Sequence, residues 1–283
     1  MEPLRLAHPT VTAHWLLNNL KHTDIVILDA SMQNPTTPPE KALEAPEDQI
    51  PGTRYFDITN VFSDTYSGVP NTIPSARLFE VEVEKLGITN SSIIIVYDRS
   101  GIYSSPRAWW LFRAMGHASI AVLDGGFPDW LATNLPTEGK RVSDWQKGSF
   151  KATLNSTKAV TASQVLEAFN NQNICILDAR SPDRFDGSKE EPRPGLRSGH
   201  IPNSKNLHYQ KVLQNGKMQA SQELNVIFES MQLQDKQLVF SCGSGITACI
   251  LVLAADIIGY KGIKLYDGSW NEWGSRPELP IAR

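Results

Sequence analysis

The sequence predicts an α/β protein that contains two copies of one domain. Short apolar runs rich in Ile, Val and Leu alternate with longer segments of helical periodicity, a pattern typical of parallel strands joined by helices. The 283 residues, 41% of them hydrophobic, are enough to build two cores. In addition, landmarks of the first half recur in the same order in the second half, which indicates an internal duplication.

Four pairs of matching segments define the repeat, and their offset along the chain is nearly constant. Residues 25–30 (IVILDA) match 174–179 (ICILDA), 50–52 (IPG) match 201–203 (IPN), 94–98 (IIVYD) match 238–242 (LVFSC), and 123–130 (LDGGFPDW) match 266–273 (YDGSWNEW). A period this long excludes a solenoid of short repeats and indicates two whole domains.

In the first copy, apolar runs predict strands at residues 25–28, 93–97 and 119–123. Helical patterns at residues 76–86 and 105–115 each stop at a glycine, as expected of a helix C-cap. In the second copy, the same reasoning predicts strands at 174–177, 237–241 and 263–266 and helices at 162–169, 221–231 and 247–258. Uncharged apolar strands suit a parallel sheet covered by helices on both faces.

We expect a first domain at residues 1–140, a linker at 141–158, and a second domain at 159–283. The linker assignment depends on a stretch before residue 159 that is polar and only weakly periodic. In parallel α/β sheets, functional sites form at the carboxyl ends of the strands. Reactive side chains directly after the apolar runs are therefore the candidates for a functional site.

Cys242 stands at such a position, because it follows the apolar run that ends at Ser241. Small residues and then a helical pattern come next, so the thiol lies in a tight loop at a helix N-terminus. There, inward-pointing N–H groups and the helix dipole favour a nucleophilic thiolate. Gly243 and Gly245 would allow positive φ angles as the loop curls around the sulfur. The alternative is a buried structural cysteine.

In the first copy the matching position holds Asp98, which cannot carry sulfur, so we expect that copy to be catalytically inactive.

Composition excludes several other classes of function. Lys and Arg number 27 against 30 Asp and Glu, a net charge of −3, so no basic excess would attract nucleic acid. No apolar run is long enough to span a membrane, and the N-terminus lacks the pattern of a signal peptide. Three scattered cysteines predict neither disulfides nor a zinc site. We therefore expect a cytoplasmic monomer without a metal or other cofactor.

Phosphatases with a Cys-x5-Arg loop are disfavoured because the sixth residue after Cys242 is Ala248.

Taken together, these features resemble tandem-domain rhodanese-type sulfurtransferases. The duplication, Asp98 at the first loop, Cys242 at the second and the GHIP segment at residues 199–202 carry the resemblance, which covers roughly residues 25–280. It implies two tandem rhodanese-like domains, each a mostly parallel sheet with helices on both faces. It also implies sulfur transfer through a persulfide on Cys242, with no cofactor.

The loop CGSGITA at residues 242–248 is similar to the loop of the 3-mercaptopyruvate sulfurtransferase subfamily. Thiosulfate sulfurtransferases of the family typically place basic residues directly after the cysteine, where this chain has Gly243 and Ser244. The resemblance thus implies a small-molecule sulfur donor, 3-mercaptopyruvate, that releases pyruvate. Two alternatives stay open: a thiosulfate sulfurtransferase, and a non-enzymatic persulfide carrier or sensor.

The resemblance also implies roles for individual residues. Cys242 and Ser244 would be catalytic, and Arg184 and Arg193 would hold the carboxylate and ketone of the substrate, a task that suits the planar guanidinium. The remaining loop residues expected to contact substrate are Gly243, Gly245, Ile246 and Thr247. Alternatively, the arginines could pair with nearby acidic residues, namely Asp183, Glu190 or Glu191.

The expected acceptor of sulfur is a thiol, such as thioredoxin or a small thiol, or cyanide. One departure from the family pattern concerns proton transfer. The subfamily often has a histidine in the first domain that faces the loop serine, but residues 57–74 contain none, and Asn71 is the nearest counterpart. Asn71 can form hydrogen bonds but cannot shuttle a proton, so a Ser-His-Asp arrangement on Ser244 is not expected.

Overall fold

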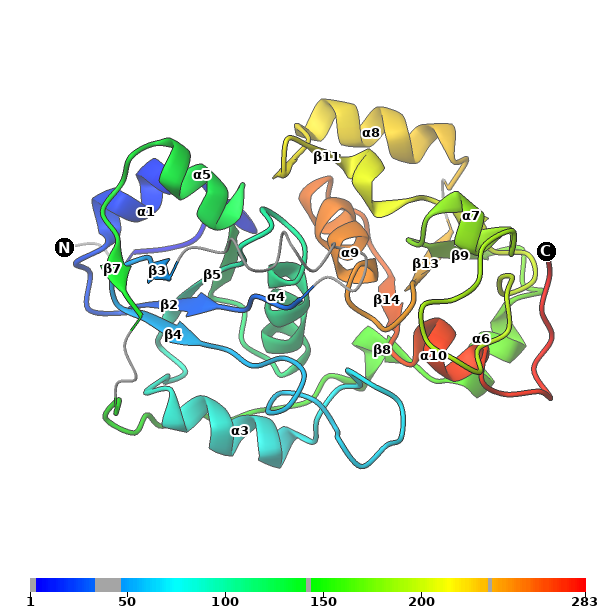
Figure 1. Cartoon of the computed structure of the whole chain (residues 1–283), viewed down its shortest axis with the longest axis horizontal. Helices are drawn as coiled ribbons and strands as arrows, with labels where there is room; N and C mark the ends of the chain where they lie inside the picture. Colours follow the sequence, from blue (N-terminus) through cyan, green and yellow to red (C-terminus); the bar gives the residue numbers. More distant parts are fainter. Residues whose placement is uncertain (1–3, 34–46, 141–143, 234–235) are drawn as a thin grey trace. The chain divides into compact units, whose positions relative to one another are not determined.

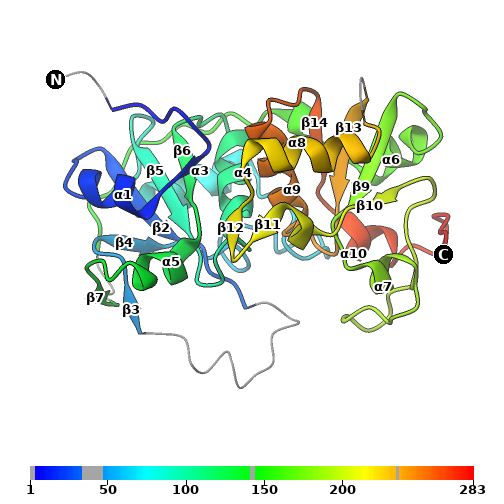
Figure 2. The same cartoon turned by 90° about the horizontal axis from the view of Figure 1, so that it is seen from above.

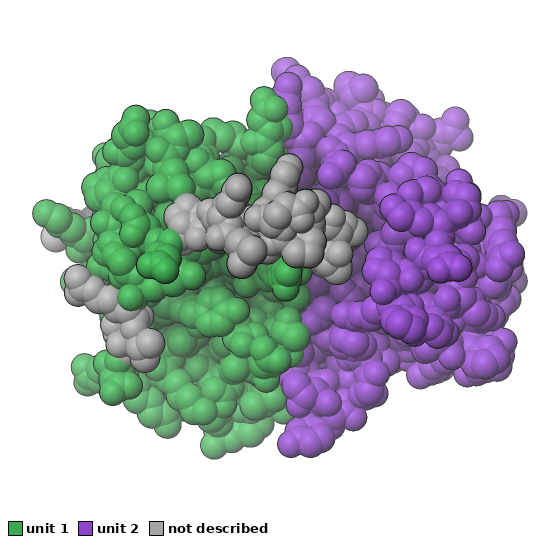
Figure 3. Space-filling model, in the orientation of Figure 1, with its two compact units in different colours: residues 1–62, 74–154, 215–217 green, residues 63–73, 155–214, 218–283 purple. Residues whose placement is uncertain are grey.

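The computed structural model describes residues 4–33, 47–140, 144–233 and 236–283. Its contacts divide the chain into two units (Figure 3). Unit 1 contains residues 1–62, 74–154 and 215–217, and unit 2 contains residues 63–73, 155–214 and 218–283. The chain therefore passes from unit 1 to unit 2 after Leu154. Two short segments, 63–73 and 215–217, pack with the unit to which their sequence neighbours do not belong.

Unit 1 is built on a parallel sheet of five strands in the order β1-β6-β5-β2-β4. The strands are β1 (Thr10–Val11), β2 (Ile25–Asp29), β4 (Thr53–Tyr55), β5 (Ile93–Tyr97) and β6 (Ile120–Leu123). In the centre of the sheet, Ile27 of β2 pairs with Ile95 of β5. Both faces of the central strands are apolar and buried, which is why the sequence shows continuous apolar runs there.

Helices cover both faces of this sheet (Figures 1 and 2). They are α1 (Ala13–Asn19), α3 (Ala76–Lys85), α4 (Ser105–Ala114) and α5 (Gly126–Ala132). On one face, α1 and α5 pack on Ile27, Ile95 and Leu123. On the other, Phe79 of α3 and Phe112 of α4 meet edge to face, with ring centres 5.0 Å apart. A short antiparallel pair, β3 (Asp48–Gln49) and β7 (Glu138–Gly139), lies beside the sheet.

Unit 2 repeats the plan with a parallel sheet in the order β10-β9-β13-β14-β8. The strands are β8 (Ala159–Val160), β9 (Ile174–Asp178), β10 (Lys205–Asn206), β13 (Gln237–Ser241) and β14 (Ile263–Tyr266). The helices are α6 (Ala162–Ala168), α7 (Pro182–Phe185), α8 (Ser221–Ser230), α9 (Ala248–Ile257) and α10 (Ser269–Trp273). Two 3₁₀ turns, η1 (Ser156–Lys158) and η2 (Tyr209–Val212), and a hairpin of β11 (Leu213–Gln214) and β12 (Lys217–Met218) complete the described elements.

The two faces of the unit 2 sheet are covered differently. On one face, α6 and α10 pack on Ile176, Val239 and Tyr266, and Trp270 and Trp273 of α10 are fully buried. On the other face lie α8 and α9 (Figures 1 and 2). Almost every residue of α9 is buried, so this helix is apolar on all sides.

The predicted fold class is confirmed, and the strands and helices expected from the apolar runs are present with ends that agree within one or two residues. The elements that the sequence did not predict are short: α1, α5, α7, α10 and the edge strands. A helix of four to seven residues completes too few turns to establish a periodic pattern. None of the described helices has the length and apolar character needed to cross a membrane.

Candidate active site

Cys242 directly follows β13, at the carboxyl end of the unit 2 sheet. The neighbouring strand β9 ends at the same level, because Ser241 pairs with Asp178 and the Ala179 N–H donates to the Ser241 carbonyl at 2.8 Å. The Cys242 side chain is buried, with 1% of its surface exposed. In the described part of the chain, its sulfur has one hydrogen-bond partner, the Ser269 hydroxyl, at 4.0 Å.

The first turn of α10 fixes the backbone at Cys242. The Cys242 N–H donates to the Ser269 hydroxyl oxygen at 3.2 Å, and the Trp270 and Asn271 N–H groups donate to the carbonyls of Cys242 and Gly243 at 2.9 and 2.8 Å. Ser269 adopts φ +50°, in the left-handed region that a serine rarely occupies. The repeated DGSW landmark of the sequence therefore holds the cysteine in place, a role that the sequence did not reveal.

The two loop glycines serve different purposes. Gly245 has φ +75°, so the predicted positive φ is confirmed there. For Gly243 that prediction is wrong, because its φ is not positive. Instead, a Cβ on Gly243 would come within 3.0 Å of Nη2 of Arg184. The glycine therefore leaves room for the Arg184 guanidinium over the loop, and a side chain at residue 243 would make that guanidinium shift by a few tenths of an ångström.

Arg184 comes from α7 and belongs to a buried chain of alternating charges. Its Nε and Nη2 donate to the two carboxylate oxygens of Glu191 at 3.1 and 2.6 Å. Oε1 of Glu191 also accepts from Nη1 of Arg180 at 2.8 Å, and Arg180 pairs in turn with Asp178 at 2.7 Å. Two cations face two anions, so the chain is neutral as a whole. Of the acidic residues considered from the sequence, Glu191 is thus the one that holds the Arg184 guanidinium.

Arg193 is exposed, and no described carboxylate pairs with it. Desolvation and, secondarily, the positive charge of Arg184 lower the pKa of Arg193, which indicates that the two cations lie close enough to interact. Glu191 compensates Arg184, whereas no described residue compensates Arg193, so a net positive charge remains on this pair of arginines. Positive charge of this kind favours an anionic ligand.

The remaining predicted loop residues also lie at the carboxyl end of β13. Ser244 and Thr247 are partly exposed, whereas Gly245 and Ile246 are buried. Thr247 immediately precedes α9, so the loop ends at a helix N-terminus as predicted. A hydroxyl at Ser244 or Thr247 is accessible to a molecule that enters the loop.

His208, which the sequence analysis did not single out, lies at the same end of the sheet. The N–H groups of its neighbours, Leu207 and Tyr209, donate to the carbonyls of Asp178 and Ala179 at 3.0 and 3.1 Å, which holds His208 at the carboxyl end of β9. Desolvation lowers its pKa, the Asp183 charge opposes this, and the positive charge of Arg184 contributes to the lowering. The signal in the sequence was only its place after an edge strand.

Asn71, the counterpart of the histidine that the family pattern leads one to expect, belongs to unit 2 with the cysteine. It is buried, with 5% exposed, and adopts φ +62°, a conformation that asparagine tolerates well. Two residues later, the Ile73 N–H donates to Oδ2 of Asp267 at 2.6 Å. The segment 63–73 is therefore attached at the start of the turn that leads into Ser269.

In unit 1 the matching loop closes around a carboxylate. Oδ2 of Asp98 accepts hydrogen bonds from the N–H groups of Tyr103, Ser104 and Ser105 at 2.9 to 3.0 Å and from the Ser105 hydroxyl at 2.6 Å. Oδ1 accepts from the Ser100 N–H at 2.9 Å. Burial raises the pKa of Asp98, while these hydrogen bonds oppose the rise. The loop design of this fold is therefore able to surround an anion at the position that Cys242 holds in unit 2.

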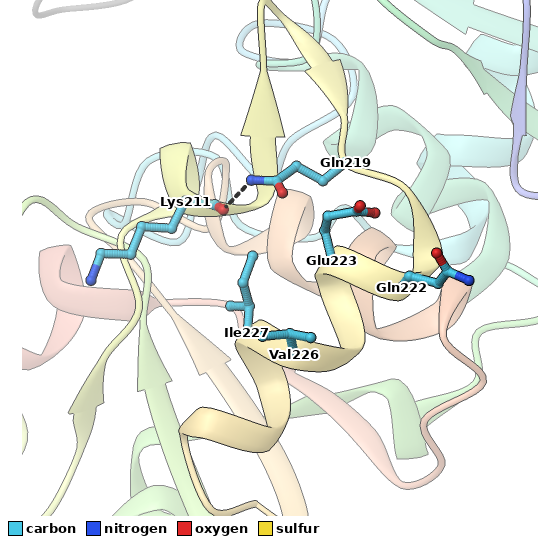
Figure 4. Close-up of a pocket in the computed structure, with 6 residues that line it drawn as sticks. All are labelled: Lys211, Gln219, Gln222, Glu223, Val226 and Ile227. Atoms are coloured by element: carbon cyan, nitrogen blue, oxygen red, sulfur yellow. Dashed lines mark hydrogen bonds between the residues drawn. The ribbon is translucent and has the colours of Figure 1, made fainter.

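A hollow of about 530 Å³ on unit 2 lies along α8 and is separate from the residues of the Cys242 loop (Figure 4). Its lining residues are Lys211, Gln219, Gln222, Glu223, Val226 and Ile227. The Lys211 side chain extends away from the others, and Gln219 bonds to the Lys211 carbonyl at 2.8 Å. The hollow contains no nucleophile. No cluster of three or more potential metal ligands occurs within the described ranges.

Comparisons with known proteins identify similar domains and chains. The rhodanese-like domain family matches residues 12–133 and 161–276. A 3-mercaptopyruvate sulfurtransferase of Escherichia coli K12 is 37% identical over 273 residues, which is 96% of each chain. A mouse (Mus musculus) protein of the same name is also 37% identical, over 97% of this chain and 94% of its own. A thiosulfate sulfurtransferase of Rattus norvegicus is 35% identical over 96% of this chain and 95% of its own.

Among solved structures, the crystal structure of SseA from Escherichia coli, described as a 3-mercaptopyruvate sulfotransferase with the rhodanese fold, superposes with a TM-score of 0.83. It has 34% identity and covers 93% of this chain and 99% of its own. The crystal structure of Tum1 from Saccharomyces cerevisiae superposes with a TM-score of 0.85 at 27% identity, over 98% of both chains.

Proposed function

This chain belongs to the rhodanese family and is a sulfurtransferase, and on that premise we propose that it transfers sulfur from 3-mercaptopyruvate to a thiol acceptor through a persulfide on Cys242. The observation that carries the choice of donor is the position of the Arg184 guanidinium directly over Gly243, one residue from the nucleophile. Arg193, exposed and without a described carboxylate partner, adds a second cation.

The choice between donors depends on the space at residue 243. Thiosulfate is a compact dianion that needs cations beside the reacting sulfur. Mercaptopyruvate instead needs its cation at the carboxylate, which lies further from the reacting sulfur. A basic side chain at residue 243 would collide with Arg184 in its observed position. Glu191 occupies Nε and Nη2 of Arg184, so the Nη1 edge is the part left to bind a substrate carboxylate.

In the first half-reaction, the Cys242 thiolate attacks the sulfur of mercaptopyruvate. A sulfur–sulfur bond forms and the carbon–sulfur bond breaks, and its electron pair leaves as the enolate of pyruvate. Protonation of the enolate carbon gives pyruvate. Ser244 and Thr247 are the loop hydroxyls placed to orient the enolate or to relay a proton from water, because Asn71 cannot supply one.

The loop N–H groups at residues 243–247 stabilise the resulting persulfide anion. Support for this step comes from unit 1, where N–H groups of the matching loop bind the Asp98 carboxylate. The resting thiol has only the Ser269 hydroxyl as a described partner. The outer sulfur of the persulfide extends further into the loop, where a N–H group can reach it.

In the second half-reaction, an acceptor thiolate attacks the outer sulfur. The acceptor leaves as a persulfide, and the Cys242 thiolate is regenerated. Thioredoxin, a small thiol or cyanide suits this step, and cyanide would leave as thiocyanate. A cycle with a covalent intermediate predicts ping-pong kinetics. All three cysteines are free thiols, which favours a reducing compartment such as the cytoplasm. We expect the enzyme to act as a monomer.

The decisive experiment measures pyruvate release from 3-mercaptopyruvate beside sulfite release from thiosulfate, for the wild type and for Cys242→Ser. We expect a strong preference for mercaptopyruvate and a loss of about 10⁴-fold or more in the variant. A preference for thiosulfate would instead assign the activity that the rat relative's name describes. No turnover of either donor would leave a persulfide carrier that is loaded by another protein.

A further inference from the structure

Unit 1 contains a cavity of about 620 Å³ that the proposed reaction does not use. It opens beside the carboxyl ends of β2 and β4 and the last turn of α3. Its lining is formed by Asp29, Ser31, Gln49, Thr53, Arg54, Tyr55, Lys85, Leu86, Arg99, Lys140 and Trp145. Cavities of this size hold small organic molecules.

The charges of the lining are unequal, with four cations and one carboxylate. Two of the cations are already paired: Arg99 with Asp29 at 3.1 Å, and Lys85 with Glu82 at 2.7 Å. Arg54 and Lys140 have no carboxylate partner among the residues that the structure describes. Among the described residues, two positive charges of the lining are therefore uncompensated.

Arg54 lines the cavity and is held in place by Leu86 and Trp145. Its Nη1 donates to the Leu86 carbonyl, and its guanidinium carbon lies 4.3 Å from the centre of the Trp145 ring. Its Nε is buried and has no hydrogen-bond partner in the described ranges. A buried donor without a partner is costly, and a bound acceptor would remove that cost. Burial also lowers the pKa of Arg54.

We propose that this cavity is a binding site for a small organic monocarboxylate with a flat aromatic body. The carboxylate accepts hydrogen bonds from Arg54 and Lys140, and the body packs against the rings of Trp145 and Tyr55. Tyr55 is available for this contact, because 59% of its surface is exposed. Aromatic rings of this kind supply much of the binding energy of small-ligand sites.

The surroundings favour one negative charge over several. The helix end at the cavity is the C-terminus of α3, whose carbonyls carry partial negative charge. Asp29 adds a full negative charge, although Arg99 compensates it. Phosphates are typically bound at helix N-termini, and α3 presents its opposite end to this cavity.

Isothermal titration of the full-length protein with indole-3-acetate tests the proposal. We expect saturable binding at one site, little binding of the neutral indole-3-acetamide, and affinity at least about tenfold weaker in Arg54→Gln. Lys140→Gln, a change at an exposed residue, should weaken binding several-fold and keep the fold intact if Arg54→Gln does not. Lys85→Gln is the matched control, because that cation is already paired with Glu82.

Other results overturn the proposal. Equal binding of the acetamide would remove the role of charge, and no binding at millimolar indole-3-acetate would remove the site. Binding that survives Arg54→Gln and Lys140→Gln but is lost in Arg184→Gln would belong to the Cys242 loop. Turnover of mercaptopyruvate by Arg54→Gln and Lys140→Gln is expected to match the wild type, so a failure of the proposed activity stays distinguishable from a failure of this site.

Discussion

The loops that follow β5 in unit 1 and β13 in unit 2 occupy the same place in the repeat but bind different groups. In unit 1, Asp98 is surrounded by N–H donors, and the next residue, Arg99, pairs with Asp29 at the end of β2. In unit 2, Cys242 has one described partner at its sulfur. The residue that follows Cys242 is a glycine, over which an arginine from another segment lies.

The difference shows that the same loop position can hold a hydrogen-bonded structural carboxylate in unit 1 and the thiol proposed to react in unit 2. In each unit a central strand, β2 or β9, ends with a buried aspartate that pairs with an arginine. Asp29 pairs with Arg99, and Asp178 pairs with Arg180. In unit 1 the loop itself supplies the arginine, so the loop is occupied by its own side chains. In unit 2 the arginine comes from the chain just after β9, so the space at Gly243 is left for Arg184. A reactive loop therefore depends on which segment compensates the strand-end aspartate.

The strongest way to break this arrangement is Glu191→Gln, which removes the anion between Arg180 and Arg184. Loss of one partner of a buried ion pair costs about 3–5 kcal/mol of stability. We also expect KM for mercaptopyruvate to rise about tenfold or more, because Arg184 loses the group that orients it. Urea unfolding and steady-state kinetics measure the two effects.

The matched change in unit 1 is Glu82→Gln, which removes the partner of the exposed Lys85. Exposed pairs contribute about 0–1 kcal/mol, so this variant should unfold nearly like the wild type. If Glu191→Gln shifts kcat with KM unchanged, Glu191 does not act by positioning the substrate-binding arginine.

Gly243→Arg makes the unit 2 loop resemble that of unit 1, where Arg99 follows the anchor residue. The new side chain displaces Arg184, whose Nη2 lies 3.0 Å from the position of the added Cβ. We expect kcat/KM for mercaptopyruvate to fall about 100-fold, since both steric fit and the carboxylate contact are lost. Turnover of thiosulfate should fall less or rise, which a parallel sulfite assay detects.

Gly243→Ala separates the steric effect of a side chain at residue 243 from the effect of its charge, because alanine adds the Cβ but no positive charge. A wild-type ratio of the two donor activities in Gly243→Arg would contradict the assignment of donor preference to residue 243.

Asp98→Asn tests whether the unit 1 loop is purely structural. The amide cannot accept from all the N–H groups that now converge on Oδ2, so buried donors lose their partner. We expect a loss of about 1–3 kcal/mol in the free energy of unfolding. Sulfur transfer per folded molecule should be unchanged, because the carboxylate takes no part in it. Lower turnover at full folding would assign Asp98 a catalytic influence.

The smallest expected effect concerns His117. In unit 1 this residue follows the glycine at the end of α4, and in unit 2 Tyr260 follows the glycine at the end of α9. His117 is buried beside Phe112 and Phe150, and this desolvation lowers its pKa below the ordinary 6.5. The unfolded chain then binds the proton more readily. Stability is therefore complete above about pH 6.5 and declines as the pH falls through 6.5 toward the folded pKa.

Replacing the histidine by the residue of the other repeat, His117→Tyr, or by His117→Phe should flatten this decline by about 1 kcal/mol per pH unit at most. Urea unfolding at pH 5, 6, 7 and 8 measures it. An unchanged slope in both variants would show that other groups control the stability of the protein toward acid.

Much of the fold could be predicted because the parallel strands are buried on both faces. Residues 93–97 are apolar throughout and residues 238–240 form the apolar centre of 237–241, so both strands could be predicted from the chain and agree with β5 and β13. The place of the proposed nucleophile, Cys242, could also be predicted, since a strand, a tight loop and a helix are consecutive in sequence. The short helix α10 escaped prediction, although it anchors the cysteine through Ser269 and Trp270.

The sequence by itself determined the duplication, the α/β class and the place of Cys242, because each depends on residues that are adjacent along the chain. Only the tertiary structure decided that Glu191 fixes Arg184, that Gly243 is needed for space instead of a positive φ, and that residues 63–73 pack with unit 2. Glu191 was one of three acidic candidates near Arg184 in the sequence, and the other two features join segments that are distant along the chain. They depend on burial and on the pairing of charges across the end of the sheet, which no local pattern records.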